Sequence, residues 1–355
     1  DDPAARFIPD RPPTTAIGSE SSFDLARKWL HECHENHKEC PKSVGILPSR
    51  VLDIGARFPI RSVKLHWTEE GESGRYAALS YCWGGLQPIS STQHTAQDFT
   101  DGILFSKFPQ TLQDAMITTF KLGIRYLWID CLCIIQDDPE DMAREIAKMA
   151  QIFEEAYVTI SASSARNVNE GFLSPREPPV DSRLKLPYQT DDDGEMGSII
   201  IEQPRQYSPE QTPISLRAWT LQEHILSPRI LDYSVQELWW VCRSATLYNG
   251  SSEAQATPLS TNTQFPRAGM ASLESWRSIV RDYTRRFLTY PSDKLPAISG
   301  VAAEYDKIFD GTYLAGLWQF ALVSELMWSS NRSDITRPAL QRAPSWSWAS
   351  VDGEI

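Results

Sequence analysis

Long apolar runs are missing from this 355-residue sequence. No stretch approaches the roughly 18 apolar residues that a membrane-spanning helix requires. The chain opens with Asp1, Asp2 and Pro3, and the apolar segment of a secretory signal does not follow them. We therefore expect neither a transmembrane span nor an export signal.

Runs of basic residues are missing as well. Lys and Arg total 34 against 46 Asp and Glu, and the formal net charge is −12. A field of this sign repels phosphate backbones and anionic lipid head groups. We therefore expect no nucleic-acid partner and no membrane partner, whereas a small-molecule ligand in a local basic pocket stays compatible with the charge.

Dense cysteine spacing is also absent, which argues against a disulfide framework. The six cysteines are Cys33, Cys40, Cys82, Cys131, Cys133 and Cys242. Two of them lie inside a strongly apolar run, so we expect reduced thiols and a cytoplasmic location. The glycine spacing around Gly84 and Gly85 does not match the fingerprint of a dinucleotide-binding loop.

Apolar periodicity is what the sequence does have, and it predicts an α/β domain. Helical spacing occurs at 23–40, 109–122, 139–156 and 216–226. Apolar runs typical of strands occur at 51–54, 62–65, 77–82, 126–129, 157–162, 230–234 and 237–242. Because strands and helices alternate with short connections, we expect βαβ units and a mostly parallel sheet flanked by helices.

The chain is expected to divide into four parts: a flexible arm at 1–22, an N-terminal helix within 23–50, the α/β domain at 51–249, and a mostly helical C-terminal region at 250–355. Helices are expected there at 271–288, 294–309 and 313–328. Within the α/β domain, residues 163–213 are polar and rich in loop-forming residues. They predict an inserted excursion that reaches the site. The closing Trp346–Ser350 alternates with period two and predicts a strand that docks on the sheet.

Three motifs place polar residues at the ends of apolar strands. They read YAALSYCWG at 76–84, YLWIDCLCIIQDD at 126–138 and RAWTLQE at 217–223. Ligands of open α/β sheets bind beyond the carboxyl ends of the strands. Ser80 and Asp130 follow two such strands, so we expect them to be neighbours.

These three motifs, in this order and spacing, resemble the signature of the fungal heterokaryon-incompatibility (HET) domain. Trp29 and Leu30 with Cys33, His37 and Cys40 resemble the segment that precedes many such domains. Residues from 273 to the closing Trp346–Gly353 resemble the usual downstream region. The resemblance implies a flavodoxin-like fold distantly similar to Toll/interleukin-receptor (TIR) domains, and a role in fungal nonself recognition and programmed cell death.

Some TIR relatives cleave NAD with a catalytic glutamate, so the resemblance extends, by analogy of fold, to NAD cleavage. Glu223 is our candidate for that carboxylate, either stabilising an oxocarbenium-like centre or acting as general base. A salt bridge at a helix end is the simpler alternative for Glu223. A cofactor is not predicted, because NAD would be the substrate.

Two further residues are candidates for catalysis. Asp130 follows an apolar strand and needs a partner there, for which Arg217 is the natural choice, as a structural clamp, a substrate-positioning pair or both. Cys133 is a candidate nucleophile, with His224 as the nearest basic partner in the sequence. A small core residue is the alternative for Cys133.

The candidate substrate-binding residues are Ser80, Tyr81, Trp83, Gln136, Arg217, Trp219 and Gln222. The two tryptophans could stack on an aromatic ring such as adenine or nicotinamide, with core packing as the alternative. Gln222 offers both a donor and an acceptor, which could orient a ligand or a neighbouring loop.

Cys33, His37 and Cys40 are spaced i, i+4 and i+7, which would put them on one helical face. Thiolate and imidazole are zinc ligands, but a structural site needs a fourth, for which His34 and Cys242 are available. A packed helix face is the favoured interpretation without that ligand, so we assign no metal from the sequence.

The function predicted from these features is a hydrolase of the NAD glycohydrolase type. One alternative is a non-catalytic signalling module that self-associates or binds a protein partner. Another is a fungal biosynthetic enzyme that uses the same pocket for acid/base chemistry on a small organic substrate.

Overall fold

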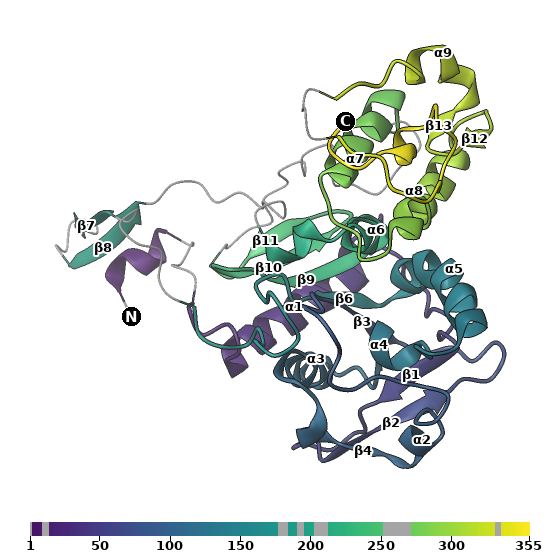
Figure 1. Cartoon of the computed structure of the whole chain (residues 1–355). Coiled ribbons are helices and arrows are strands. Elements are labelled where there is room, and N and C mark those ends of the chain that lie inside the picture. Colours follow the sequence, from purple (N-terminus) through teal and green to yellow (C-terminus); the bar gives the residue numbers. More distant parts are fainter. Residues whose placement is uncertain are drawn as a thin grey trace.

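A nine-stranded mixed sheet forms the centre of the computed structural model (Figure 1). The structure describes residues 2–8, 14–176, 184–189, 195–201, 212–250, 271–330 and 335–355. In spatial order the strands are β11 (Thr246–Tyr248), β10 (Leu238–Cys242), β9 (Arg229–Tyr233), β6 (Val158–Ser161), β3 (Tyr76–Ser80), β5 (Tyr126–Trp128), β1 (Arg50–Asp53), β2 (Ser62–Trp67) and β4 (Ile103–Leu104).

Four adjacent strands at the centre of this sheet, β9, β6, β3 and β5, run parallel. Residues of β3, β6 and β9 are buried throughout, as expected for strands covered on both faces. The outer strands pair antiparallel. The α/β class is thus confirmed, but the sheet is mixed, because the connections of β1 to β2 and of β9 to β10 are too short for a parallel crossover.

The order of the parallel strands reverses direction between β3 and β6. From β3 the chain steps to β5 on one side, then crosses back to β6 and β9 on the other. Since such crossovers are right-handed, the helix after β3 and the helices after β5 and β6 belong on opposite faces. A reversal of this kind leaves a crevice outside the carboxyl ends of the two strands.

The helices agree with this arrangement. α3 (Gln110–Lys121) lies beside α1 (Glu20–Asn36), whose Arg27 donates to the Lys121 carbonyl at 2.7 Å. On the other side, α5 (Pro139–Glu155) and α6 (Trp219–Leu226) pack on each other (Figure 1). The remaining short elements of this part are α2 (Asp98–Asp101), α4 (Asp130–Cys133) and the 3-10 turns Phe105–Lys107 and Pro213–Leu216.

α1 begins and ends earlier than its periodicity predicted. Ser19 caps its N-terminus through the Ser22 amide, and the helix ends at Asn36, so His37 and Cys40 lie beyond it. The expectation that Cys33, His37 and Cys40 share one helical face is therefore wrong. His37 adopts extended backbone angles, φ −84° and ψ 111°, which turn the chain out of the helix.

The C-terminal region packs against the α/β part through α8 (Pro296–Asp306), which contacts both α5 and α6. α7 (Leu273–Thr284) and α8 confirm two predicted helices. The third, expected at 313–328, is wrong. β12 (Tyr313–Leu314) and β13 (Leu317–Trp318) form a hairpin there, followed by a 3-10 turn (Gln319–Ala321) and the short α9 (Leu322–Glu325).

The backbone of the hairpin turn explains that error. Ala315 has φ 46° and Gly316 φ 102°, both left-handed, and a right-handed helix cannot include them. Tyr313 and Trp318 then face each other across the two strands, with ring centroids 5.1 Å apart. Aromatic packing across the hairpin therefore outweighs the helical propensity of the segment.

The closing tryptophan segment is also not a strand. Trp348–Ser350 form a 3-10 turn, which Ser347 caps by accepting from the Ala349 amide. The buried Trp348 donates from its indole to the Gly316 carbonyl at 3.0 Å and meets Tyr283 edge-on. The segment thus closes on the C-terminal region and does not extend the sheet.

The polar excursion at 163–213 lies partly outside the described residues. Within it, β7 (Leu184–Gln189) and β8 (Met196–Ile201) form a separate hairpin that contacts the N-terminal 3-10 turn Pro3–Arg6 (Figure 1). Asp2 accepts from both the amide and the hydroxyl of Ser198. The described hairpin therefore does not reach the carboxyl ends of β3 and β5.

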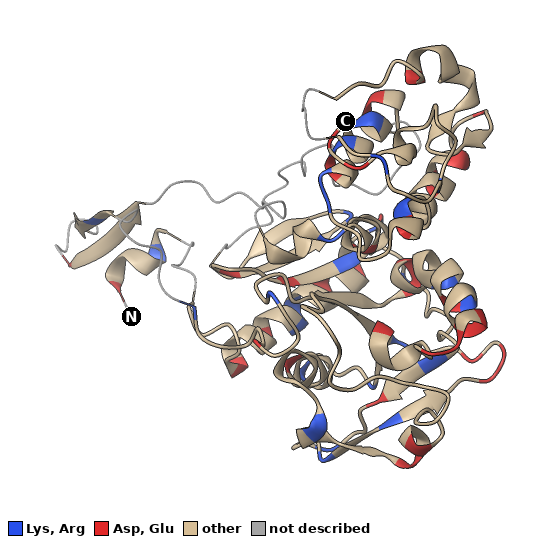
Figure 2. Cartoon of the chain, in the orientation of Figure 1, with Lys and Arg blue, Asp and Glu red and all other residues tan. Residues whose placement is uncertain are grey.

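Charged side chains are distributed over the helices and loops in Figure 2, whereas the central strands carry few of them. One continuous core of buried apolar residues extends from α1 through the sheet to the C-terminal tryptophans. In the part of the chain that the structure describes, no helix is both long and apolar enough to cross a bilayer.

Candidate functional site

The first and third motifs meet at a serine–glutamate contact. Ser80 ends β3, Glu223 lies on α6, and the serine hydroxyl donates to the glutamate carboxylate. Ser80 and Glu223 are each only 5% exposed. The chain thus brings a carboxyl group, 143 residues away in sequence, to the carboxyl end of the central parallel strand.

The second motif joins the first through Asp130. This residue begins α4, directly after β5, and its carboxylate accepts from the Trp83 indole at 2.8 Å and from the Cys131 amide at 2.7 Å. Ser80 and Asp130 thus both follow neighbouring parallel strands, as the sequence predicted.

Arg217 links the third motif to the first, but in a different way from the one expected. Its guanidinium donates to the Tyr81 carbonyl, and among the described residues it forms no direct ion pair with Asp130. The predicted Asp130–Arg217 clamp is therefore not a direct ion pair, and the Asp130 oxygens accept instead from the Trp83 indole and the Cys131 amide. The arginine acts through space, and its charge opposes the rise in pKa of both Asp130 and Glu223.

Burial controls the protonation of this cluster. Burial raises the pKa of Glu223 to about 7, with the Asp130 charge adding to the rise, while Arg217 and the Ser80 hydrogen bond oppose it. The pKa of Asp130 is raised by burial too. A carboxyl group that is half ionised near neutral pH can both accept and donate a proton.

A cavity of about 30 Å³ adjoins Ser80 between the ends of β3 and β6. Hydroxyl groups of Thr159 and Ser161 line it, together with His224 and Arg286. This space accommodates one or two water molecules, whereas small-molecule sites measure several hundred Å³. In this conformation the cavity next to Ser80 is therefore too small to enclose a nucleotide.

Two cavity residues, His224 and Arg286, were not among the candidate site residues, although the sequence had suggested His224 as a basic partner for Cys133. Burial and the positive charge of Arg286 lower the pKa of His224 to about 4, so its imidazole is neutral. Arg286 follows α7 and donates to the Thr220 hydroxyl at 3.3 Å and to Asp282 at 2.9 Å. Nothing in the local sequence pointed to Arg286, because its place depends on a backbone bridge between Arg217 and Phe287.

A larger open groove, of about 520 Å³, lies along β2 and the segment 97–100. None of its lining residues belongs to the three motifs. The motifs and this groove are thus separate features of the molecule.

Trp219 and Gln222 anchor α6 to the C-terminal region. The Trp219 indole donates to Asp293 at 3.1 Å, and the Gln222 side-chain carbonyl accepts from the Gly300 amide at 2.7 Å. Trp83 is half-buried, and its indole N–H is engaged by Asp130. These contacts give the three side chains structural partners in the absence of a ligand.

Tyr81 and Gly84 shape the turn after β3. Tyr81 is buried, and its hydroxyl donates to Gln87 at 3.3 Å. Gly84 has φ 69°, and a Cβ there would lie 2.0 Å from that of Asn167. Only glycine fits this close approach of the first motif to the segment after β6.

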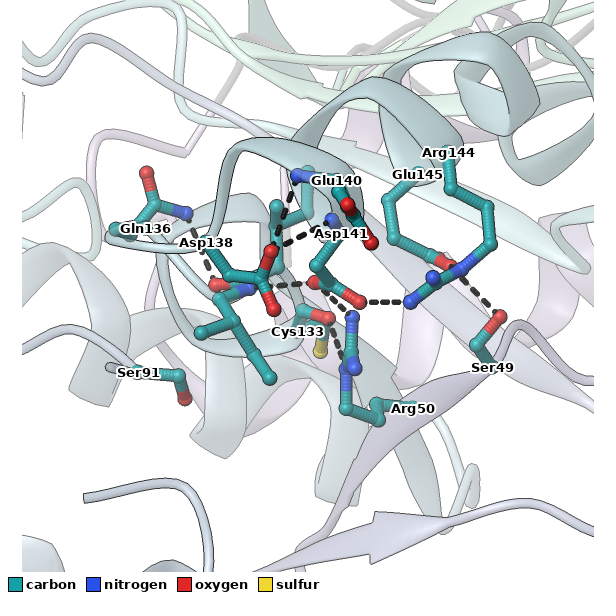
Figure 3. Close-up of polar contacts among 12 residues, drawn as sticks. Ser49, Arg50, Ser91, Cys133, Gln136, Asp138, Glu140, Asp141, Arg144 and Glu145 are labelled. Carbon is teal, nitrogen blue, oxygen red and sulfur yellow. Dashed lines mark hydrogen bonds and ion pairs between the residues drawn. The ribbon is translucent and has the colours of Figure 1, made fainter. Parts of the chain in front are cut away.

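Cys133 and Gln136 belong to the second motif, and both form hydrogen bonds with its backbone (Figure 3). The Cys133 thiol is fully buried and accepts from the Ile129 amide at 3.5 Å, and burial raises its pKa to about 12. Gln136 donates to the carbonyls of Asp130 and Ile134, at 3.2 and 3.0 Å. The structure therefore places Cys133 in the core as a neutral thiol and Gln136 in the loop as a brace.

A buried ion pair holds the same loop, and the sequence did not reveal it. Arg50 on β1 donates to the Cys133 carbonyl at 2.6 Å and to the Asp141 carboxylate at 2.5 Å (Figure 3). Asp141 also accepts from the Ile135 amide at 2.9 Å. Arg50 and Asp141 are 1% and 2% exposed, so their charges depend on each other.

Comparison with known families found a match that spans all three motifs. Residues 76–223 match the model of the heterokaryon incompatibility protein (HET) family, a range that begins at β3 and ends at Glu223. Neither the curated proteins nor the solved structures gave a match. Residues 76–223, which contain all three motifs, are therefore similar to the heterokaryon incompatibility (HET) family.

Proposed function

We propose that this chain acts in heterokaryon incompatibility, as part of nonself recognition and cell death, and that its HET domain hydrolyses NAD or a related nucleotide. The observation that carries the proposal is Glu223. A buried carboxyl with a pKa of about 7, hydrogen-bonded to Ser80, which lines a water-sized cavity, has the features of a general base.

The place of this carboxyl in the sheet supports a ligand site. Numbered along the chain, the four parallel strands lie in the order 2-1-3-4, which is the order of flavodoxin-like sheets. Ligands of those sheets bind where the order reverses, between the first and third strands. Ser80 ends the first of these strands and Ser161 the third. The order also favours the likeness to TIR domains that we propose for this fold.

The proposed reaction breaks the bond between nicotinamide and the ribose C1′ of NAD. The bonding electron pair leaves with nicotinamide, which departs as a neutral molecule and leaves an oxocarbenium ion at C1′. The Glu223 carboxylate stabilises this cation and then takes a proton from the water that adds to C1′. The products are nicotinamide and ADP-ribose.

The surrounding charges have separate parts in this proposal. Arg217 and Arg286 lie close enough to Glu223 to act on its pKa, and they supply positive charge for the pyrophosphate. Asp130, held by Trp83, keeps the turn after β3 in place. Because the cavity measures only about 30 Å³, a nucleotide must displace the side chains of His224 and Arg286 on entry.

One observation favours a second candidate function. Glu223 is 5% exposed and the cavity next to its partner Ser80 measures about 30 Å³, as expected for a structural cluster in a non-catalytic signalling module. Such a module would self-associate or bind a protein partner. We propose a cytoplasmic location for either function, since all six cysteines are free thiols.

Nicotinamide release from NAD by the purified chain tests the proposal. The Glu223→Gln variant keeps the size and the acceptor for Ser80 but removes the charge. Glu70→Gln makes the same chemical change at an exposed position and is the matched control. Release by the wild type and the control, but not by a folded Glu223→Gln variant, supports the hydrolase. Equal release by all three contradicts the role of Glu223, and no release by any contradicts NAD hydrolysis and favours the module.

A further inference from the structure

Four potential metal ligands from distant parts of the chain come together beside α1. Cys33 lies in the last turn of α1, His37 caps the helix, Cys40 follows in the next loop, and Cys242 ends β10. One ligand atom from each residue lies within 4.8 Å of all the others. We propose that these four residues bind one zinc ion, as a structural Cys₃His site that ties the N-terminal helix to the sheet.

The spacing of the ligand atoms suits zinc. A tetrahedral ion with Zn–S bonds of about 2.3 Å holds its ligands roughly 3.8 Å apart. Here the Cys242 sulfur lies 3.3 Å from Nδ1 of His37, and the largest separations require an approach of about an ångström. All three thiols are buried, His37 is half-buried, and no disulfide joins the cysteines. Ligand type and geometry therefore both fit.

A buried arginine beside the cluster indicates, independently of the ligand geometry, that the cluster carries negative charge. Arg229 is 1% exposed, and its Nε donates to the Cys33 sulfur at 3.2 Å. Its other nitrogens donate to the carbonyls of Tyr157 and Pro41. Within the described residues no carboxylate pairs with Arg229, although a buried guanidinium requires an opposite charge.

Zinc supplies that charge balance. Three thiolates and a neutral imidazole around Zn²⁺ leave a net charge of −1, because three negative charges exceed the two of the ion. The Arg229 guanidinium neutralises it, and an N–H···S hydrogen bond from outside the ligand shell orients the Cys33 thiolate. With neutral thiols, Arg229 would be buried without a counter-charge.

The location points to a structural role. Cys242 pairs with Arg229 at the amino end of β9, whereas Ser80 and Ser161 lie at the carboxyl ends of the parallel strands. The cluster and the motif site therefore lie at opposite ends of the sheet. Four protein ligands also leave no open position for a substrate or a reactive water.

Metal content of the intact chain tests the proposal. The protein is expressed in zinc-supplemented medium, purified without chelator and analysed by inductively coupled plasma mass spectrometry. We expect about one zinc per chain, a loss of at least tenfold in Cys40→Ser and Cys242→Ser, and no loss in Cys82→Ser, which removes a buried cysteine outside the cluster. Zinc at less than a tenth of an equivalent in the wild type, or retained in both ligand variants, overturns the proposal.

A second measurement needs no variant, so it remains decisive if the ligand variants fail to fold. X-ray absorption at the zinc edge of the wild type should show three sulfurs at about 2.3 Å and one nitrogen at about 2.0 Å. A shell without sulfur overturns the site. Mass spectrometry of the alkylated, unreduced chain covers the remaining outcome, since a disulfide within the cluster of the native protein also contradicts zinc binding.

Discussion

The Ser80 hydroxyl donates to a Glu223 carboxyl that burial keeps half-protonated near neutral pH. One partner comes from the end of β3 and the other from α6, near opposite ends of the range that matches the HET family. A hydroxyl that always donates leaves the second carboxyl oxygen free to gain or lose a proton. The protonation state of this group therefore governs both the proposed chemistry and part of the stability, and each can be measured.

The rate of nicotinamide release should depend on pH through Glu223. Stabilisation of the oxocarbenium ion requires the carboxylate, which predominates only above the pKa of about 7. We expect the rate constant to fall about tenfold for each pH unit below 7 and to level off above it. Turnover measured from pH 5 to 8.5, with enzyme-free blanks for the spontaneous decay of NAD, checks this. A flat profile excludes Glu223 as the ionised group.

The Glu223→Gln variant should be more stable than the wild type at pH 8 and equal to it at pH 4. The folded pKa of about 7 lies above the ordinary value of 4.5, so the folded state binds the proton more tightly. The contribution of Glu223 to the stability of the wild type is thus fully present below pH 4.5 and is lost as pH rises through 7. The shift corresponds to about 3 kcal/mol, which Gln does not lose.

Urea unfolding of both proteins at pH 4 and pH 8 measures this difference. The exposed Glu70→Gln variant is the control, and its free energy of unfolding should differ from the wild type by less than about 0.5 kcal/mol at either pH. A stability difference for Glu223→Gln that is the same at both pH values would count against a raised pKa.

Breaking the buried Arg50–Asp141 pair should destabilise the chain strongly. Arg50→Met removes the buried partner of Asp141 and leaves the exposed Arg144 as its remaining ion-pair partner, so we expect a loss of about 3 kcal/mol, the lower end of the range for a broken buried pair. Arg125→Met removes an exposed partner of Asp53 and should cost less than about 1 kcal/mol. Chemical denaturation of the two variants compares them directly. Similar losses would mean that the buried pair is not needed to hold the second motif.

Gly84→Ala should disrupt the turn after β3 more than a matched glycine substitution elsewhere. Gly84 and Gly123 both have positive φ, 69° and 75°, so alanine strains the backbone at each. Only at Gly84 would the new Cβ collide, 2.0 Å from that of Asn167, whereas Gly123 has open space. We expect a loss of about 1 kcal/mol at Gly123 and at least twice that at Gly84. Melting temperatures that fall equally would argue against the close approach.

The local periodicity of apolar residues predicted many of the helices and strands, because each of them is specified by the pattern within its own segment. α3, α5 and the buried strands β3, β5 and β6 lie within one or two residues of their expected ranges. The hairpin at β12 and β13 was mistaken for a helix, since its apolar residues suit either structure and the choice depends on packing of Tyr313 and Trp318. The closing tryptophans were misjudged for the same reason, because Trp348 docks on Gly316.

The sequence by itself determined the α/β class and the three polar motifs at strand ends, because each element and each motif depends on residues close together in the chain. Tertiary structure alone decided which of those residues touch. In the folded chain Ser80 contacts Glu223, and Asp130 contacts Trp83 and not Arg217. Arg50, Arg286 and Cys242 come from distant segments to the buried ion pair, the cavity and the cysteine cluster. Charge pairing and burial act through space, so the pKa of Glu223 and the proposed zinc cluster exist only once the chain has folded.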